Sequence, residues 1–147
     1  MGSFDPSGNI YIAEWGSHHV RQVNPSGIIS TLAGNENAAF CGDGGAAASA
    51  CLRAPYAVAA DGSGNVFIAD SGNSRIRKVT VSTNVSTKKI STVAGGGSVL
   101  GDNDPATKAA PSVPYGVAVF PTTSASTAKS LYIADTGNKR IRRVTLQ

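Results

Sequence analysis

The sequence has few of the residues that enzymes and membrane proteins rely on. Its 147 residues include two histidines, two cysteines, one methionine and one tryptophan, and 15% are charged. No apolar run approaches the roughly 18 residues of a membrane-spanning helix, and no signal-peptide pattern opens the chain. We therefore expect no contact with a membrane. The hydrophobic content of 41% is too high for a disordered chain, and the length suits one domain.

Catalytic and metal-binding patterns are also missing. No Gly-x-Ser-x-Gly motif or Ser-His-Asp set is recognisable, and the glycine-rich stretch at residues 42–45 lacks the lysine of a phosphate loop. His18 and His19 are adjacent, so on a strand they point to opposite faces and cannot easily share one metal. The oxygens of residues 102–104 are conceivable calcium ligands, but they lack EF-hand spacing and fit a turn better. We predict no enzyme, no metal and no cofactor.

What the sequence does have is an internal repeat. Three segments superimpose position for position without a gap: residues 9–23, 65–79 and 130–144. The flanking segments repeat as well, since IISTLAG recurs as KISTVAG and the connector at 41–55 recurs loosely at 100–114. Such a period, with several short strands in each copy, is typical of the blades of a β-propeller.

The repeat predicts four short antiparallel strands per blade. In the best-kept copy they cover residues 56–60, 66–70, 75–80 and 90–93, with glycine- and serine-rich turns between them. We predict an all-β fold, a propeller fragment of about three blades in one domain covering residues 1–147. The expected blades cover about 5–34, 55–95 and 114–147, with connectors between them. The opening MGSF occupies the place of a first strand but fits the strand pattern poorly.

The stretch GNVFIADSGNSRIRKV, followed by ISTVAG and accompanied by a GDGG connector, resembles the NHL repeat. The resemblance covers nearly the whole chain from Asp5 onward, and it implies a β-propeller that has six blades in most members. Three near-blades alone would expose blade faces and unpaired strand edges. We therefore expect two copies to associate as a homodimer with about six blades.

The net charge is +4, and most of the positively charged residues lie in or beside the repeated segments, mainly in the third strands. An acidic residue ends the second strand and a basic residue begins the third, which predicts ion pairs across the hairpin turns. The predicted pairs are Asp70 with Arg75, Asp135 with Arg140 and, more weakly, Glu14 with His19. An alternative is RNA binding by these arginines, as in some NHL proteins, but aromatic residues for base stacking are sparse, at 6%. Nucleic acid is therefore not the favoured partner.

A metal-dependent propeller lyase or hydrolase is a second alternative. It would draw histidines from several blades, and only one blade here has any. The favoured function is a non-enzymatic scaffold that binds a protein, a peptide or a glycan.

Trp15 is the most irregular position in the repeat. It stands where the other copies have Ser71 and Thr136, in a turn on the propeller face that usually binds ligands. The predicted contact surface consists of Trp15, His18, Phe40, Arg53 and Lys139. The other interpretation is that Trp15 covers the first blade or seals a subunit seam.

Cys41 and Cys51 flank a connector whose copy carries no cysteine. They either form a disulfide, worth about 2–3 kcal/mol for a loop of roughly ten residues, or serve as two small apolar side chains. Asn84 begins an acceptor sequence for N-glycosylation in an expected surface loop. Together these features favour a secreted or extracellular protein.

Overall fold

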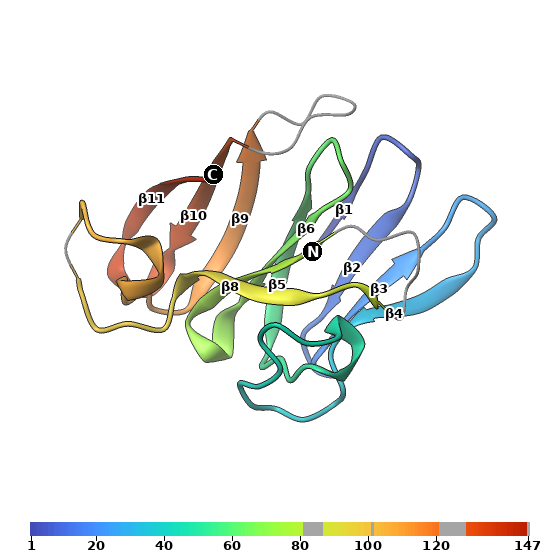
Figure 1. Cartoon of the computed structure of the whole chain (residues 1–147), viewed down its shortest axis with the longest axis horizontal. Coiled ribbons are helices and arrows are strands. Elements are labelled where there is room, and N and C mark those ends of the chain that lie inside the picture. The colour runs from blue at the N-terminus through green and yellow to red at the C-terminus, as the bar shows by residue number, and fades with distance from the viewer. Residues whose placement is uncertain (81–86, 101, 121–128, 147) are drawn as a thin grey trace.

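The computed structural model describes residues 1–80, 87–100, 102–120 and 129–146. The regular elements of these residues are β-strands and single-turn 3-10 helices. The strands form three antiparallel sheets that follow one another along the chain (Figure 1). The fold is all-β, and the sheets are successive blades of a β-propeller. None of the described helices is long and apolar enough to cross a membrane.

Each blade is built from strands that are neighbours in sequence. Blade 1 contains β1 (Gly2–Phe4), β2 (Ile10–Glu14), β3 (His19–Val23) and β4 (Ile29–Ala33). Blade 2 contains β5 (Pro55–Ala60), β6 (Val66–Asp70), β7 (Arg75–Val79) and β8 (Ile90–Gly95). Blade 3 contains β9 (Pro114–Phe120), β10 (Ser130–Asp135) and β11 (Arg140–Thr145).

Short 3-10 helices occupy matching places outside the sheets. One pair lies in the connectors between blades, η1 (Ala47–Ser49) and η4 (Ala106–Lys108). A second pair forms the turns before β7 and β11, η2 (Ser71–Asn73) and η5 (Thr136–Asn138). The residue after each turn, Ser74 or Lys139, has a left-handed backbone with φ of 53° or 55°. The repeat therefore extends to backbone conformation outside the strands.

Blade 1 begins earlier than the predicted boundary at residue 5. Residues Gly2–Phe4 form β1, and Phe4 pairs with Ile10 while Gly2 pairs with Ile12. The sequence pattern of MGSF was a poor guide because three residues show little alternation. The side chain of Phe4 is also exposed, as in an edge strand with one open face. Blade 1 thus has four strands, as blade 2 has.

One acidic side chain organises the first hairpin of blade 1, and another does so in blade 2. The Asp5 carboxylate accepts hydrogen bonds from the backbone N–H and the side-chain amide of Asn9, at 3.0 and 2.9 Å. Asp61 accepts the same two bonds from Asn65, both at 2.8 Å. Burial works to raise the pKa of Asp5, but these bonds and one from the Tyr11 hydroxyl outweigh it and lower that pKa. The sequence Asp-x-Ser-Gly-Asn therefore defines this hairpin.

The hydrophobic core lies between neighbouring blades. One cluster joins blades 1 and 2, and its larger members are Tyr11, Val20, Leu32, Leu52, Val58, Val66, Ile68, Val79 and Ile90. A second cluster joins blades 2 and 3 and includes Phe67, Ile76, Val119, Leu131 and Ile133. Because burial of apolar area is the main favourable term in folding, each blade is stabilised chiefly by its neighbour.

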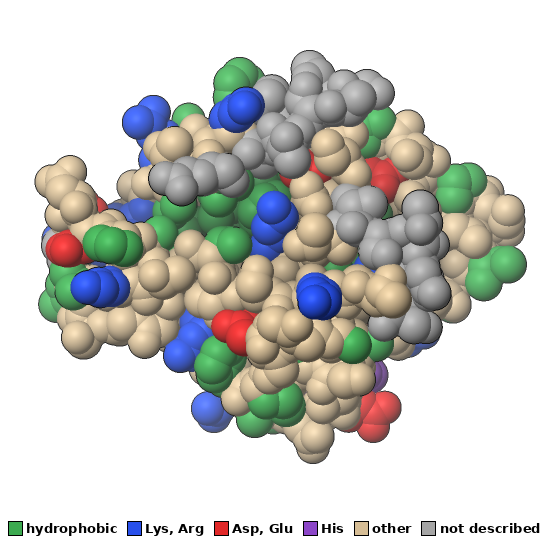
Figure 2. Space-filling model, in the orientation of Figure 1, with side chains coloured by type: hydrophobic (Ala, Val, Ile, Leu, Met, Phe, Trp, Pro, Cys, Tyr) green, Lys and Arg blue, Asp and Glu red, His purple; other side chains and the backbone are tan. Residues whose placement is uncertain are grey.

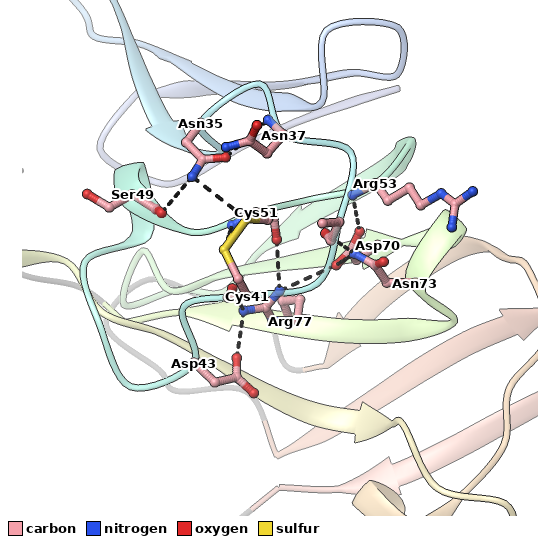
Figure 3. The surroundings of a disulfide bond; sticks show 11 residues. Asn35, Asn37, Cys41, Asp43, Ser49, Cys51, Arg53, Asp70, Asn73 and Arg77 are labelled. Carbon is pink, nitrogen blue, oxygen red and sulfur yellow. Dashed lines mark hydrogen bonds and ion pairs between the residues drawn. A yellow bond between two sulfur atoms is a disulfide. The ribbon is translucent and has the colours of Figure 1, made fainter.

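A disulfide between Cys41 and Cys51 closes the connector between blades 1 and 2 (Figure 3). The two residues also form an isolated antiparallel bridge. The side-chain amide of Asn35 donates to the carbonyl of Ser49 at 2.9 Å within the same loop. The glycosylation sequence at Asn84 lies outside the described residues.

Removing the disulfide should lower the free energy of unfolding. The double variant Cys41→Ser, Cys51→Ser is expected to lose about 2–3 kcal/mol, because the unfolded chain regains the entropy of a loop of roughly ten residues. Urea unfolding followed by circular dichroism measures the loss. Dithiothreitol should destabilise the wild-type chain similarly and leave the double variant unchanged. An unchanged urea midpoint in the double variant would show that the bridge adds no stability.

Candidate functional site

Each connector lies over the hairpin turn of the blade that follows it. In blade 2, the Gly72 N–H donates to the Arg53 carbonyl at 2.8 Å, and the Asn73 amide donates to the Ala39 carbonyl at 2.7 Å. In blade 3 the Gly137 N–H makes the matching bond to Ser112 O (2.8 Å), and the Asn138 amide donates to a different connector carbonyl, that of Ala110 (3.0 Å). Connector and turn together form one surface per blade, here called the turn-and-connector face. It comprises the turns at 15–18, 71–74 and 136–139 and the connectors at 35–54, 96–100 and 102–113.

The predicted ion pairs across the hairpins of blades 2 and 3 are wrong. Asp70 Oδ2 lies 3.4 Å from Arg77 Nη1, and Asp135 Oδ2 lies 2.6 Å from Arg142 Nε. In blade 1 the expected partner His19 does lie near Glu14, at 3.8 Å, and Arg21 lies at 3.7 Å. The arginine that recurs as partner is therefore two residues beyond the predicted one.

Arg75 and Arg140 begin the third strands, and their side chains bind elsewhere. Arg75 is directly opposite Asp70 in the β6–β7 register. Its guanidinium donates to the Asn73 carbonyl at 2.9 Å and lies 3.8 Å from the ring centroid of Phe40. Arg140 donates to the carbonyl of Leu100 at 3.2 Å. The first arginine of each strand lies beside the turn and binds a carbonyl of the turn or the connector. The arginine two residues further on lies on the same face of the strand, and this second arginine binds the buried carboxylate.

Arg77 joins the first connector to blade 2 (Figure 3). Its buried guanidinium donates to Asp43 Oδ1 at 2.6 Å and to the carbonyls of Cys41 and Cys51 at 3.2 and 3.3 Å, besides Asp70. Asp43 also accepts the backbone N–H of Thr92 at 3.2 Å. One side chain thus binds a hairpin carboxylate, both ends of the disulfide loop and the GDGG segment.

Blade 3 repeats this arrangement with more solvent access. Arg142 binds Asp102 at 3.3 Å and donates to the carbonyl of Leu100 at 3.1 Å. Its side chain is about one-tenth exposed and that of Asp102 is largely exposed, whereas the Arg77 side chain is fully buried.

The two hairpin carboxylates differ in the direction of their pKa shifts. Burial raises the pKa of Asp70 even though Arg53 N–H, Asn73 and Arg77 act in the opposite direction. Burial also works to raise the pKa of Asp135, but bonds from Asn138, Ser112 N–H and Arg142 outweigh it and lower that pKa. Desolvation of the charged form therefore dominates in blade 2, and hydrogen bonding to it dominates in blade 3.

The predicted contact residues all lie on the turn-and-connector face, but they do different things. Trp15 is 62% exposed in the β2–β3 turn. His18 Nδ1 accepts the N–H of Ala54 at 3.1 Å and so holds the connector to blade 1. Phe40 covers the guanidinium groups of Arg75 and Arg77.

The other two predicted contact residues are exposed. The Arg53 side chain points away from Asp70, while the Arg53 backbone N–H donates to Asp70 Oδ1 at 2.7 Å (Figure 3). Lys139 lies in the turn of blade 3 at the place that His18 has in blade 1. His18 and Phe40 thus make contacts that stabilise the loops, and Phe40 is also 42% exposed. The side chains of Trp15, Arg53 and Lys139 are exposed to solvent.

The connector carboxylates Asp43 and Asp102 were not among the predicted site residues. The sequence does indicate this pairing, because both aspartates and both of their arginine partners recur at matching positions of the repeat. Among the described residues, no group of three or more His, Cys, Asp or Glu side chains is arranged to hold a metal ion.

Similar proteins share the fold over part of their length. No protein-family model matches the chain. Teneurin-1 of Mus musculus is 36% identical over 90 residues, which cover 52% of this chain and 3% of teneurin-1. A solved structure of a protein of unknown function from Bacteroides thetaiotaomicron superimposes with a TM-score of 0.73 and 21% identity, covering 94% of this chain and 32% of that one.

An auxiliary nutrient binding protein from Bacteroides thetaiotaomicron superimposes equally well, with a TM-score of 0.73. Its sequence is 20% identical, and the match covers 97% of this chain and 36% of that chain. The chain therefore spans about a third of these structures. At such identities the similarity shows a common fold.

Replacing Arg77 should destabilise the chain more than replacing Arg142. Arg77→Met leaves the buried Asp70 carboxylate without its guanidinium, a change expected to cost about 3–5 kcal/mol. Arg142→Met should cost at least about 1 kcal/mol less, because the Arg142 side chain is itself about one-tenth exposed and its second partner Asp102 is largely exposed. Urea unfolding of both variants measures the two losses. The double variant Asp70→Asn, Arg77→Met serves as control and should recover part of the loss, since no unpaired charge stays buried. Equal losses in the two single variants would contradict this ranking.

Proposed function

We propose that this chain is a non-enzymatic propeller scaffold whose turn-and-connector face binds a protein, a peptide or a glycan. The observation that carries the proposal is Trp15, an indole that is 62% exposed at a turn tip where the other blades have Ser71 and Thr136. Aromatic side chains supply a large share of binding energy at interfaces. A loop residue on a rigid framework is a common location for binding function.

The framework around this face is well fixed. The connector beside Trp15 is closed by the Cys41–Cys51 disulfide and bound by Arg77. His18 holds the same connector to the turn that carries Trp15. A surface that is ordered before binding loses less conformational entropy when a ligand arrives. This order supports a role in recognition.

Self-association is the second part of the proposal, and the exposed end faces of the blades support it. On blade 1, Ile10 and Ile12 point away from blade 2 and are exposed. Their equivalents in blade 2, Val66 and Ile68, are buried against blade 1. On blade 3, Ile141 is 74% exposed.

The equivalent of Ile141 in blade 2 is Ile76, which is buried against blade 3. The outer face of blade 3 therefore carries the same kind of residues that blade 2 uses to contact blade 3. The outer face of blade 1 carries the same kind of residues that blade 2 uses to contact blade 1, so the two outer faces are complementary. Stacking at both ends would give a homodimer with about six blades. Figure 2 shows hydrophobic side chains at the surface over β9 to β11.

The disulfide also supports a location outside the cytosol, because such bonds persist in oxidising compartments. The arginines of the third strands support RNA binding less well than they support a structural role. Arg77 is buried and Arg142 is nearly so, and both hold connectors. Arg140 and Arg143 are exposed but lack neighbouring stacked aromatics within their strand.

Trp15 should report ligand binding directly. It is the sole tryptophan of the chain, so a ligand on this face should shift its fluorescence emission, whereas one bound elsewhere should not. A panel of soluble oligosaccharides and peptides serves as the set of probes. For any probe that shifts the emission, Trp15→Ala should weaken binding at least about tenfold by calorimetry. Trp15→Phe should lose less. Unchanged affinity in Trp15→Ala, with wild-type solution mass, would refute the site.

Solution mass should test the association of end faces. Light-scattering chromatography at micromolar concentration is expected to give twice the chain mass of 14.9 kDa. Ile141→Glu should shift the mass to that of one chain, since a charge would be buried in the contact. The exposed residue Ser91 in the outer strand of the middle blade provides the control, and Ser91→Glu should leave the mass unchanged. A wild-type mass of one chain at this concentration would overturn the association.

A further inference from the structure

Two tyrosines lie on the inner wall of the propeller, the side that faces its central axis. The first strands of neighbouring blades contact one another, so β1, β5 and β9 form this wall. Tyr56 belongs to β5 and Tyr115 to β9, at matching positions of the repeat. Their rings stack across the boundary between blades 2 and 3, with centroids 4.5 Å apart and an angle of 22° between the ring planes. The pair is therefore a joint surface of two blades.

A β-bulge sets each tyrosine outside the regular pairing of its strand. In β5 the pairing with β6 steps from Pro55 to Ala57, so Tyr56 has no partner in that register. Tyr115 is left out of the β9–β10 register in the same way. Bulges redirect side chains and are frequent beside functional sites. Neither tyrosine belongs to the clusters that join the blades, so both rings lie on the inner wall instead.

The backbone shortly before each tyrosine is left-handed. Ala54 has φ of 47°, and its equivalent Val113 has φ of 45°. This conformation is uncommon without glycine, and it is costly for a β-branched residue such as valine. Strain of this kind is concentrated at sites where side chains are positioned for a ligand. The chain adopts it at both matching places, directly ahead of the bulge that presents the tyrosine.

The stacked pair is open to solvent. Tyr56 is 40% exposed although blade 2 has a blade on each side, and Tyr115 is 42% exposed. Because stacking covers one face of each ring, this exposure belongs to the other face and to the ring edges. Among the residues that the structure describes, neither tyrosine hydroxyl has a hydrogen-bond partner. The pair thus offers an aromatic face together with two hydroxyl groups that can each donate and accept.

The same wall carries backbone groups for hydrogen bonding. In the described part of each sheet, β5 pairs with β6 alone and β9 with β10 alone, so the other edge of each inner strand faces the axis. Such an edge presents N–H and C=O groups. The Ala60 N–H belongs to this edge, since it donates to Ser3 Oγ of β1 at 3.2 Å. Aromatic rings and a polar strand edge therefore meet on one surface.

We propose that the Tyr56–Tyr115 pair binds a pyranose ring of a glycan whose hydroxyl groups are equatorial. The axial C–H groups of such a ring form a flat apolar face with a weak positive charge, which suits the negative face of an aromatic ring. The hydroxyl groups around its rim need both donors and acceptors, which the tyrosine hydroxyls and the strand edge supply. A proline-rich peptide also stacks on tyrosine, but proline has no N–H to donate, so it would use fewer of these groups.

This site lies within β5 and β9 and is separate from the turn-and-connector face. It therefore does not depend on binding at Trp15, and the two proposals can fail independently.

Saturation-transfer NMR with a soluble sugar tests the proposal. The probe is cellotriose capped as its methyl β-glycoside, in which every ring hydroxyl is equatorial. Transfer from the protein should be strongest at the axial C–H protons, and it should saturate with a Kd below about 1 mM. Sorbitol has the hydroxyl groups without the ring and is the matched control ligand. It should bind at least about tenfold more weakly.

Protein variants locate the sugar. Tyr56→Ala and Tyr115→Ala should each weaken binding at least about tenfold, since each removes a ring or its stacked support. Tyr56→Phe keeps the ring and the stack, so it should fold as the wild type does and lose about fivefold in affinity with the hydroxyl. Tyr132→Ala is the matched control, because Tyr132 in β10 is 39% exposed, and it should leave the affinity unchanged. Trp15→Ala should also bind as the wild type does.

Several results would overturn the proposal. One is the absence of saturable transfer to the capped cellotriose up to about 10 mM. Another is wild-type affinity in the alanine variants with an unchanged circular dichroism spectrum or, where these variants unfold, wild-type affinity in Tyr56→Phe. Loss of binding in Trp15→Ala alone would assign the sugar to the turn-and-connector face. Tighter binding of a polyproline peptide than of the sugar would assign the tyrosine pair to a peptide.

Discussion

The buried guanidinium of Arg77 is the interaction on which the order of blade 2 and its connector depends. A charged group removed from water costs several kcal/mol unless its hydrogen bonds and its charge are satisfied. Asp43, Asp70 and the carbonyls of Cys41 and Cys51 accept hydrogen bonds from its two terminal nitrogens, while among the described residues its buried Nε has no hydrogen-bond partner. These partners come from three separate segments, so the segments must all be in place before the guanidinium can be buried. Hairpin, connector and third strand are thereby fixed relative to one another.

The same residues in blade 3 show how much the surroundings matter. Arg142, Asp135 and Asp102 reproduce the geometry, yet the pKa of Asp135 is lowered while that of Asp70 is raised. In blade 2 the network is covered by β8 and by a disulfide-closed loop, so desolvation dominates. In blade 3 the Arg142 side chain is slightly exposed and Asp102 is largely exposed, and hydrogen bonds to Asp135 outweigh the cost of burying its charged form. An identical set of side chains is therefore more deeply buried in one blade than in the next.

The sequence was sufficient to predict the strands, because each strand could be aligned with its copies in the repeat. The β6 boundaries at Val66 and Asp70 were predicted from the repeat alone, and three further strands of blade 2 differed by a few residues at most. The ion pairs Asp70–Arg75 and Asp135–Arg140 were wrong because proximity across a turn was taken as contact. Direct cross-strand neighbours at the end of a hairpin splay around the turn, so the next residue on that face reaches the carboxylate. Side-chain direction at a strand end depends on the connector above it, and the connector is distant in sequence.

A repeat protein binds its own units through faces that recur in every unit. The kinds of residues that hold blade 1 against blade 2 are therefore also exposed on any blade face that has no neighbour. Ile10, Ile12 and Ile141 are exposed copies of residues that are buried at internal contacts. The proposed association through the ends thus requires no new type of site, only a partner that presents the surface that the repeat already binds. Trp15 is different, because no other blade has its equivalent, and it is the feature by which this chain departs from its own repeat.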